Sequence, residues 1–329
     1  MYNQTQEHLV RPELYPTLQS TYPAGHSTET ALLKVHDDIL LNMNHRRVTL
    51  LMLLDLSSAF DTVDHEVLLR RLEVTFGIAD TALQWFRSYL AGRSQRVLLN
   101  GSFSGDFSLP HGVPQGSCLG LLLFVIYASK LFGVVKRHLP DVHVYADDNQ
   151  LYISFKPGSK ASELEAVTAL QDCILDIKTW MTADKLKLND DKTELIVIGT
   201  RAQFDKISIS ELSIDHVKVS AVCNVRNLGT WFDNRLSMKT AINKTCQSGL
   251  YHLHNIGRIK RYLTFEDRES IVQAIVMSRI DYCNRLLCGV AAMNLSKLQR
   301  VQNTAVRLVC SLPRHEHITS SFMSSLAAD

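Results

Sequence analysis

The chain has 329 residues, of which 46% are hydrophobic and 21% charged, and its formal net charge is +2. This composition excludes wholesale disorder and allows two or three folded units with hydrophobic cores. Seven cysteines without a Cys-x-x-Cys spacing, and a first segment without the basic and apolar regions of a secretion signal, predict an intracellular protein of the cytoplasm or nucleus that is not secreted.

The first part of the chain alternates helical and strand-like segments. Residues 1–27 hold three prolines and a glycine, which predicts an irregular lead-in, and a helical pattern begins at Thr28. The apolar run Val48–Asp55 ends in a carboxylate and is typical of a strand buried on both faces. Helical stretches follow at 64–76 and 80–90.

A hairpin and an apolar helix come next. The stretch RVLLNGSFSGDFSLP, residues 96–110, predicts a hairpin whose turn contains Asn100 and Gly101. The apolar run Leu119–Ala128 is too short to cross a bilayer, so it predicts a buried helix, and no membrane partner is expected.

The segment HVYADDNQLYIS, residues 143–154, predicts a hairpin with acidic residues at its tip. Its flanks alternate β-forming and polar residues, and Asp147 and Asp148 lie between them. Asp and Asn tolerate turn conformations, so a solvated turn is one explanation of the pair. The other explanation is a bound cation, whose charge offsets the repulsion between the two carboxylates.

The rest of the chain completes an α/β unit and adds a helical one. We place the boundary near Asn234, because the pattern from Met238 to Cys310 is helical and basic, with interruptions near Leu263–Thr264 and Gly289. The other expected elements are an amphipathic helix over 162–181, a strand over 194–199 and strand-like segments near 207–219 and 226–232.

Charge is distributed unevenly along the chain. Residues 226–314 hold fourteen Lys and Arg against five Asp and Glu, a balance of +9, whereas residues 1–225 carry −5. Basic helices can contact phosphate groups, although positive charge is also typical of a solvated face. Charge alone therefore leaves nucleic-acid binding as one of two interpretations.

Asp55 supplies a third carboxylate at a predicted strand end. A polymerase-type site needs carboxylates on neighbouring strand ends, so that two Mg²⁺ ions about 3.5–4 Å apart can bind the attacking oxygen and the triphosphate. Because Mg²⁺ also keeps phosphate and water ligands, three acids are enough. Asp55, Asp147 and Asp148 are therefore the predicted ligands of two Mg²⁺ ions, with Mn²⁺ as an alternative metal.

Four motifs in a fixed order resemble those of a reverse transcriptase: LLDLSSAFDTVDHEVLLRRL, HGVPQGSCLGLLLFVIYASKL, YADD and LKLNDDKTELIVIG. Two further stretches, GHSTETALLKVHDDIL and NVRNLGTWFDNRLSMK, narrow the resemblance to the enzymes of non-LTR (LINE-type) retrotransposons. The resemblance covers residues 19–319.

The resemblance implies an α/β right-hand polymerase palm with partial fingers, followed by a helical thumb-like domain. Asp55, Asp147 and Asp148 would be its catalytic acids. Lys192 matches a lysine that protonates or contacts the pyrophosphate leaving group, although a solvated surface lysine is an equal alternative. The implied domains are a lead-in at 1–27, the palm at 28–234, the thumb-like region at 235–314 and a tail at 315–329.

The implied reaction is RNA-directed DNA synthesis, and the implied partners are an RNA template, a DNA primer and a dNTP. Phe60 stands at the position of a steric gate against the ribose 2′-OH, and its alternative role is ordinary core packing. Glycine at 116 permits close backbone approach, and the amide of Gln115 can bridge polar groups. The implied substrate-binding residues are Leu56, Phe60, Pro114, Gln115 and Gly116.

Departures from the family pattern leave other functions open. Pro23 stands where an arginine is common, Leu121 replaces a usual proline, and the Arg-containing fingers motif is not recognised. A second hypothesis is therefore a truncated, catalytically inactive transposon-derived fragment that at most binds nucleic acid. A third is an RNA-dependent RNA polymerase or a nucleotidyl cyclase; Phe60 argues against the former and the VPQG turn against the latter.

Overall fold

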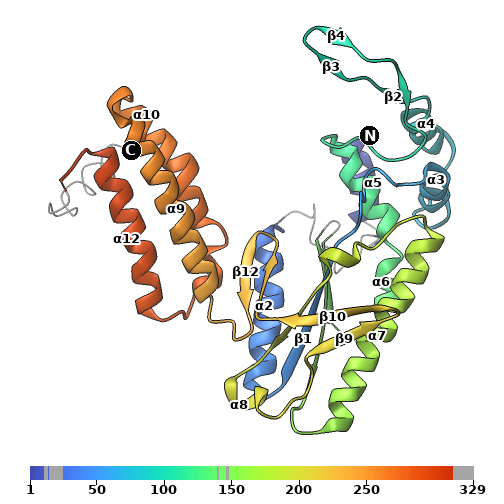
Figure 1. Ribbon diagram of the computed structural model, residues 1–329. Coiled ribbons are helices and arrows are strands. Elements are labelled where there is room, and N and C mark those ends of the chain that lie inside the picture. The colour runs from blue at the N-terminus through green and yellow to red at the C-terminus, as the bar shows by residue number, and fades with distance from the viewer. Residues whose placement is uncertain (11–13, 15–24, 139–140, 146–147, 314–329) are drawn as a thin grey trace. The chain divides into compact units, whose positions relative to one another are not determined.

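The structure, a computed structural model, describes residues 1–10, 14, 25–138, 141–145 and 148–313 (Figure 1). Its contacts divide the chain into two compact units. We call Met1–Ala31 with Asp38–Val222 the palm unit, and Leu32–Asp37 with Cys223–Asp329 the helical unit. The later boundary between the two units follows Val222. The sequence predicted this boundary near Asn234, which lies after the next β-hairpin.

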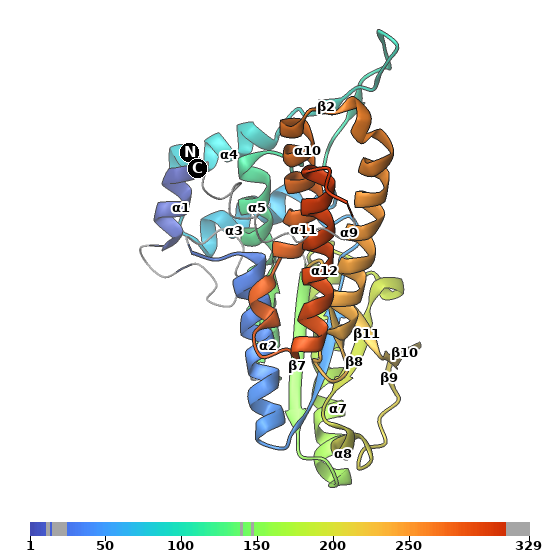
Figure 2. The same ribbon diagram turned by 90° about the vertical axis from the view of Figure 1, so that its left-hand side faces the viewer.

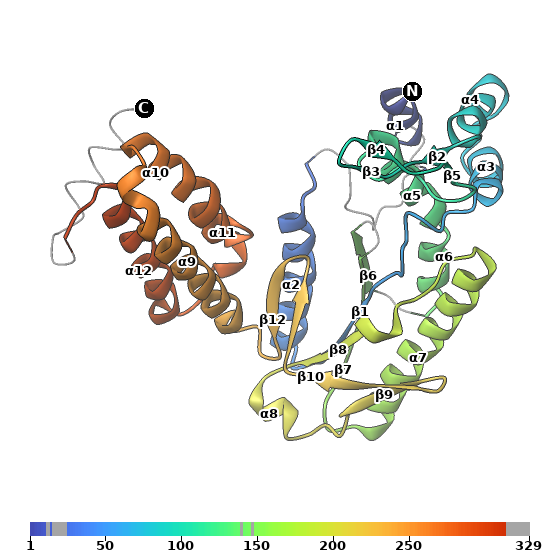
Figure 3. The ribbon, with the colours of Figure 1, turned by 45° about the horizontal axis from the view of Figure 1, so that its top comes forward.

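The palm unit is built on a six-stranded sheet with the order β6-β7-β1-β8-β10-β9 (Figure 3). β1 pairs antiparallel with both β7 and β8, and β10 pairs parallel with β8. β1 is apolar except for Thr49, which fits a strand that is buried on both of its faces. The strands are β1 (Val48–Leu54), β6 (Asp141–Tyr145), β7 (Asp148–Phe155), β8 (Glu194–Ile198), β9 (Glu211–Ile214) and β10 (Val217–Val222).

One face of the sheet carries the main hydrophobic core. Alternate β1 residues, among them Leu50, Met52 and Leu54, point to this face and pack with helices α5, α6 and α7. The α7 residues Leu170, Ile174 and Ile177 are fully buried, as the amphipathic pattern predicts. These helices span Cys118–Ala128 (α5), Leu131–Val135 (α6) and Lys160–Ala183 (α7).

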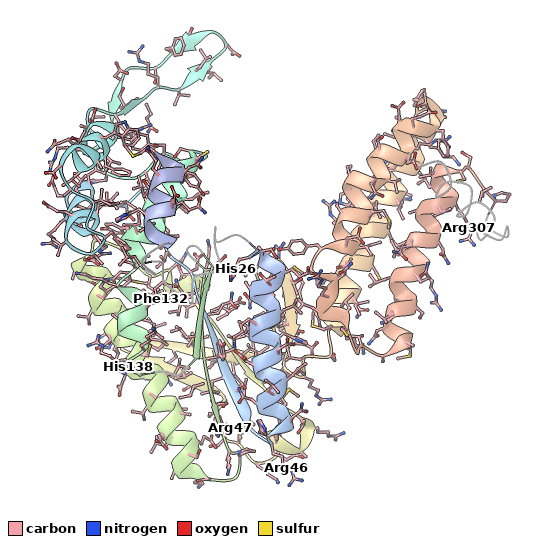
Figure 4. The ribbon with its side chains drawn as sticks, turned by 180° about the vertical axis from the view of Figure 1, so that it is seen from behind. His26, Arg46, Arg47, Phe132, His138 and Arg307 are labelled. Carbon is pink, nitrogen blue, oxygen red and sulfur yellow. The ribbon has the colours of Figure 1, made fainter. Side chains whose placement is uncertain are left out.

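Helix α2 (Thr28–Asn44) contacts the opposite face of the sheet, as Figure 2 shows. Tyr152 Oη donates to Asp38 Oδ2 at 2.6 Å, and Ser154 Oγ donates to Asn42 Oδ1 at 3.1 Å. Arg47, between α2 and β1, donates through Nε to Ser154 Oγ at 2.8 Å (Figure 4). These hydrogen bonds form only if β7 keeps its present register relative to α2.

The first residues form a helix, which corrects the expectation of an irregular lead-in. Helix α1 (Tyr2–Val10) buries Leu9 in the palm core, and a 2.7 Å hydrogen bond joins His8 Nε2 and the Phe76 carbonyl. The prolines that suggested irregularity all follow this helix, and a proline after a helix does not interrupt it. Helices α3 (His65–Val74) and α4 (Asp80–Leu90) lie where the sequence predicts them.

The predicted hairpin near Asn100 is present. Asn100 and Gly101 have φ values of 48° and 80°, as a two-residue hairpin turn of type I′ requires. Leu98, Leu99 and Phe103 are more than half exposed on it. Its short strands are β2 (Ser94–Gln95), β3 (Leu98–Leu99), β4 (Ser102–Phe103) and β5 (Phe107–Ser108).

Helix α5 is almost entirely apolar. Together with α6 it forms the stretch Cys118–Val135, which by length and composition alone could cross a membrane, although 72% of it is buried inside the protein. Phe124 and Tyr127 are fully buried. Burial of this kind is typical of the core helix of a globular unit.

The helical unit begins with a β-hairpin and continues as packed helices. Leu228 and Gly229 have φ values of 42° and 87°, so the segment predicted as one strand near 226–232 turns back on itself. The segment near 207–219 likewise holds two strands, because Asp215 has a φ of 52°. The unit contains β11 (Asn224–Asn227), β12 (Thr230–Asp233), α9 (Lys239–Ile259), α10 (Phe265–Val272), α11 (Ser278–Asp281) and α12 (Ala292–Val309).

A buried polar cluster joins α3, α5 and the end of α7. Arg71 Nη2 lies 2.6 Å from Asp184 Oδ2, and both side chains are at least 90% buried. Tyr127 Oη donates to the Asp184 carbonyl and accepts from the Asp64 backbone amide. Burial opposes ionisation of Asp64, but hydrogen bonds from Lys185 and from a backbone amide of α3 hold its pKa below the ordinary value. The cluster connects residues more than a hundred positions apart.

We expect Arg71→Met to destabilise the palm unit by about 3–5 kcal/mol, because it leaves the Asp184 carboxylate buried without its counter-charge. Thermal unfolding followed by circular dichroism measures this loss. Arg70→Met is the matched control, since Arg70 is exposed on the same helix and should barely change the melting temperature. Arg71→Met combined with Asp184→Leu should recover much of the stability; equal melting temperatures for Arg71→Met and Arg70→Met would contradict the prediction.

Candidate active site

The register between β1 and β7 brings Asp55 beside Asp148. Leu54, the last residue of β1, is paired with Asn149, the second residue of β7, so Asp55 and Asp148 are the next residues beyond this last pair. Residues directly opposite in such a pair have Cβ atoms about 4.5–5.5 Å apart and point to the same face. Asp148 is exposed, and the Asp55 side chain is 29% exposed. The register therefore brings Asp55 and Asp148 to the same end of the paired strands.

The third predicted ligand, Asp147, lies outside the described residues, so its convergence with Asp55 remains a prediction. Asp148 is the first residue of β7 and pairs with Tyr145, and Asn149 is buried inside the strand. Asp148 and Asn149, which the sequence placed in the hairpin tip, therefore belong to β7. Within the described part of the chain, no group of three or more His, Cys, Asp or Glu side chains is arranged to hold a metal ion.

Two donors from the segment before β8 contact the Asp55 carboxylate. Lys192 Nζ lies 3.2 Å from Oδ2, as an ion pair with a lysine that is 68% exposed. Asn189 Nδ2 donates to the same oxygen at 3.2 Å. The structure therefore brings together Lys192 and Asp55, two of the site residues predicted from the sequence, and adds Asn189, which the sequence reasoning missed although it lies in the quoted LKLNDDKTEL motif.

Glu194 is another carboxylate on this face of the sheet that the sequence reasoning missed. It is paired with Leu53 of β1, two positions before Asp55, and side chains two positions apart on a strand share a face. Burial raises the pKa of Glu194 above its ordinary value. The only sign of Glu194 in the sequence was that it is a single polar residue directly before the apolar run LIVI.

The turn predicted to contact substrate is hydrogen-bonded to the loop that follows β1. Val113 N donates to the Phe60 carbonyl at 2.8 Å, and Gln115 Nε2 donates to Asp61 Oδ1 at 3.1 Å. Gly112 has a φ of 86°, and a Cβ atom there would lie 2.9 Å from the Asp61 carbonyl oxygen. Only glycine permits this close approach, so the VPQG turn has a fixed position next to the Asp55 loop.

The same turn leads into helix α5. Ser117 caps the helix by accepting from the Gly120 amide at 2.9 Å, and its hydroxyl donates to the Pro114 carbonyl at 2.8 Å. Gly116 has a φ of 79°, and no atom lies within 4 Å of the position a Cβ would take. Gly116 and Gln115 are therefore presented on an exposed turn whose ends are held by hydrogen bonds.

Phe60 and Leu56 differ in their accessibility. The Phe60 ring is half-buried and packs against Phe124, with 4.8 Å between the ring centroids. Leu56 is only 7% exposed and packs in the core, so any substrate contact there falls to its backbone. Phe60 thus packs against the core while part of its side chain stays accessible to solvent.

The helical unit contains a separate groove with basic and aromatic walls. Its volume is about 520 Å³, and Arg226, Lys244 and Arg279 line it together with Trp231 and Tyr282. Lys244 Nζ lies 5.7 Å from the centroid of the Trp231 ring, and Tyr282 Oη donates to a carbonyl of the β11–β12 turn at 2.6 Å. Cations beside aromatic rings are typical of grooves that follow nucleic-acid strands.

Comparison with known proteins identifies relatives among transposon polymerases. The probable RNA-directed DNA polymerase from transposon BS of Drosophila melanogaster is 24% identical over 319 residues, which cover 94% of this chain and 34% of that protein. The probable RNA-directed DNA polymerase from transposon X-element, also of Drosophila melanogaster, is 23% identical over 305 residues, or 89% of this chain and 32% of that protein. The chain therefore spans about a third of the length of these relatives.

A solved structure of apo telomerase from Candida Tropicalis, truncated from its C-terminal domain, aligns with a TM-score of 0.46 and 13% identity, over 70% of this chain and 44% of that one. The reverse transcriptase (RNA-dependent DNA polymerase) family matches residues 1–232, a range that includes every strand of the six-stranded sheet, Asp55, Asp148 and the segment carrying Lys192. The chain accordingly belongs to the reverse transcriptase (RNA-dependent DNA polymerase) family, in its non-LTR, LINE-type branch.

Proposed function

We propose that this chain is an RNA-directed DNA polymerase domain that transfers a nucleotide from a dNTP to the 3′ end of a DNA primer paired with an RNA template. The observation that carries the proposal is the placement of Asp55 next to Asp148 at the ends of paired strands, with Lys192 within reach of the same carboxylate. Family membership supports the reaction type.

The two described acids fit a divalent metal site. Carboxylate oxygens on adjacent strands are hard donors, and Mg²⁺ prefers such ligands while it keeps phosphate and water in its other positions. Asp147 is the proposed third ligand. When bound, two Mg²⁺ ions, or Mn²⁺ in their place, would stabilise charge on the triphosphate and make the primer hydroxyl a better nucleophile.

The remaining residues divide the other tasks between them. Lys192, mostly exposed and carrying an ammonium, holds a proton at Nζ that can neutralise the pyrophosphate as it leaves. Gln115 and Gly116, on the exposed turn, contact the template base and the incoming nucleotide. The half-buried Phe60 side chain would collide with a ribose 2′-OH and so favour a dNTP.

The basic groove of the helical unit is proposed to bind the backbone of the template and primer. Its cations contact phosphates, and the Trp231 and Tyr282 rings supply faces for stacking. Because the groove lies within the helical unit, binding does not depend on the carboxylates. This observation favours, as a second candidate function, a chain that binds nucleic acid without polymerising it.

Asp55→Asn and Asp148→Asn should each abolish primer extension, because an amide is a poorer ligand than a carboxylate for a divalent cation. We expect a loss larger than the about 10–100-fold cost of losing an outer-shell partner. The measurement is extension of a DNA primer on an RNA template with Mg²⁺. Asp205→Asn, an exposed charge change away from the site, is the control. Activity in either site variant equal to that of the control defeats the two-metal proposal.

Phe60→Val should raise the incorporation of rNTPs relative to dNTPs, because a smaller side chain removes a clash worth about 1–3 kcal/mol. The ratio of the two efficiencies should therefore rise by about five- to 150-fold. Phe60→Tyr keeps the ring and should leave the ratio nearly unchanged. If Phe60→Val lowers stability without changing the ratio, the residue is a core aromatic and not a gate.

Affinity for an RNA–DNA hybrid should fall log-linearly with salt, by about 0.7–0.9 log units per log unit of salt for each phosphate neutralised. Lys244→Ala should make the slope shallower by about 1, since it removes one contact. Lys206→Ala, an exposed lysine of the palm unit, should leave the slope unchanged. Fluorescence anisotropy over a salt series measures both. A slope that is flat in the wild type rules out the groove as a phosphate-binding site.

A further inference from the structure

The segment between α7 and β8 lies alongside the loop that contains Asp55. Ser57 N donates to the Lys187 carbonyl at 2.9 Å, and Asn189 N donates to the Asp55 carbonyl at 2.9 Å. Leu56 and Leu188 form an antiparallel bridge between these two bonds. The main chain therefore holds Asn189 at a fixed position relative to Asp55.

The side chain of Asn189 continues this contact to the carboxylate. Its Nδ2 donates to Asp55 Oδ2 at 3.2 Å, the oxygen that Lys192 also contacts. The two donors differ in kind, because Asn189 is neutral and half-buried, whereas Lys192 is charged and 68% exposed. A neutral amide donor can fix the orientation of a carboxylate while leaving its negative charge available to a cation. A charged, mobile lysine is suited to leave the carboxylate and follow a phosphate group.

The start of this segment is held in the protein interior. Asp184 forms the buried ion pair with Arg71 and accepts from Tyr127 through its carbonyl, and Lys185 contacts Asp64. Displacing the segment would therefore separate a buried pair of charges, which is costly. The segment that carries Asn189 is consequently anchored at its start by Asp184 and Lys185.

We propose that Asn189 is a positioning residue that holds Oδ2 of Asp55 and so aligns this carboxylate for a divalent cation, a task that Lys192 does not share. The inference rests on the proposed function and deepens it. Outer-shell hydrogen bonds of this kind fix the orientation of metal ligands, and their removal typically weakens metal affinity or activity by about 10–100-fold.

The test is binding of Mn²⁺ to the full chain, followed by electron paramagnetic resonance without nucleotide. Asn189→Ala and the volume-matched Asn189→Leu should each raise the Kd for Mn²⁺ by about 10–100-fold. The control is Lys187→Ala, an exposed side chain on the same segment, which should bind as the wild type does. Lys192→Ala should not weaken binding. The Mg²⁺ concentration for half-maximal primer extension should rise in the Asn189 variants, with the KM for template-primer unchanged.

Thermal unfolding of each variant separates positioning from folding. Wild-type Mn²⁺ affinity in a folded Asn189→Ala or Asn189→Leu variant overturns the inference, as does a lower melting temperature with unchanged affinity, which assigns Asn189 a structural role. If the wild type extends primers and the Asn189 variants bind Mn²⁺ as tightly as the wild type does, the inference fails but the proposed function stands. If Asp55→Asn leaves Mn²⁺ binding unchanged and the wild type extends no primer, the proposed function fails and the inference fails with it.

Discussion

The hydrogen-bond register of β1 between β7 and β8 is the constraint on which the site depends. A slip of one residue would move every side chain of β1 to the other face, so Asp55 would turn toward the core and Leu54 away from it. Burial of alternate apolar residues opposes such a slip. The hydrogen bonds of Tyr152 and Ser154 with α2 oppose it from the other face, because their partners are in reach in one alignment only.

The buried polar cluster has a different role from the apolar core. A buried ion pair such as that of Arg71 and Asp184 adds little stability compared with apolar residues of similar size, since both charges lose their water. Its effect is to specify one arrangement, because every alternative leaves a charge unpaired. Desolvation likewise raises the pKa of Tyr127 to about 12, so the hydroxyl stays protonated and keeps its hydrogen bonds across the working pH range. The segment that contacts Asp55 is therefore anchored at its start by the buried polar cluster.

Much of the fold was predictable from local pattern, and the fine geometry of the site was not. The apolar runs of β1 and α5 and the helical periodicity of α7 predicted these elements within a few residues, because burial on one face or two leaves a direct trace in the sequence. Helix α1 was missed since prolines nearby outweighed a short helical pattern. Two hairpins were read as single strands because the turn signals at Asp215 and Gly229 were given too little weight within β-forming segments.

The residues around Asp55 show why sequence reasoning ended where it did. The acids were predicted from their places at strand ends and Lys192 from the resemblance, and the structure brings Lys192 into contact with Asp55. Asn189 carries no local signal for its hydrogen bond, because the bond exists only after residues 134 positions apart meet. Gly112 likewise carries no local signal in the sequence, because its close approach to Asp61 arises only when two loops meet in the fold.

The strand order of the palm sheet also has a consequence for how the protein is made. β1 is synthesised early, but its two neighbours, β7 and β8, leave the ribosome about 100 and 145 residues later, or roughly 5–30 s at ordinary rates of translation. During that interval the stretch VTLLMLL has unpaired edges and no charged residue, the composition typical of segments that aggregate. β1 is therefore a part of the nascent chain that we expect to need protection by chaperones.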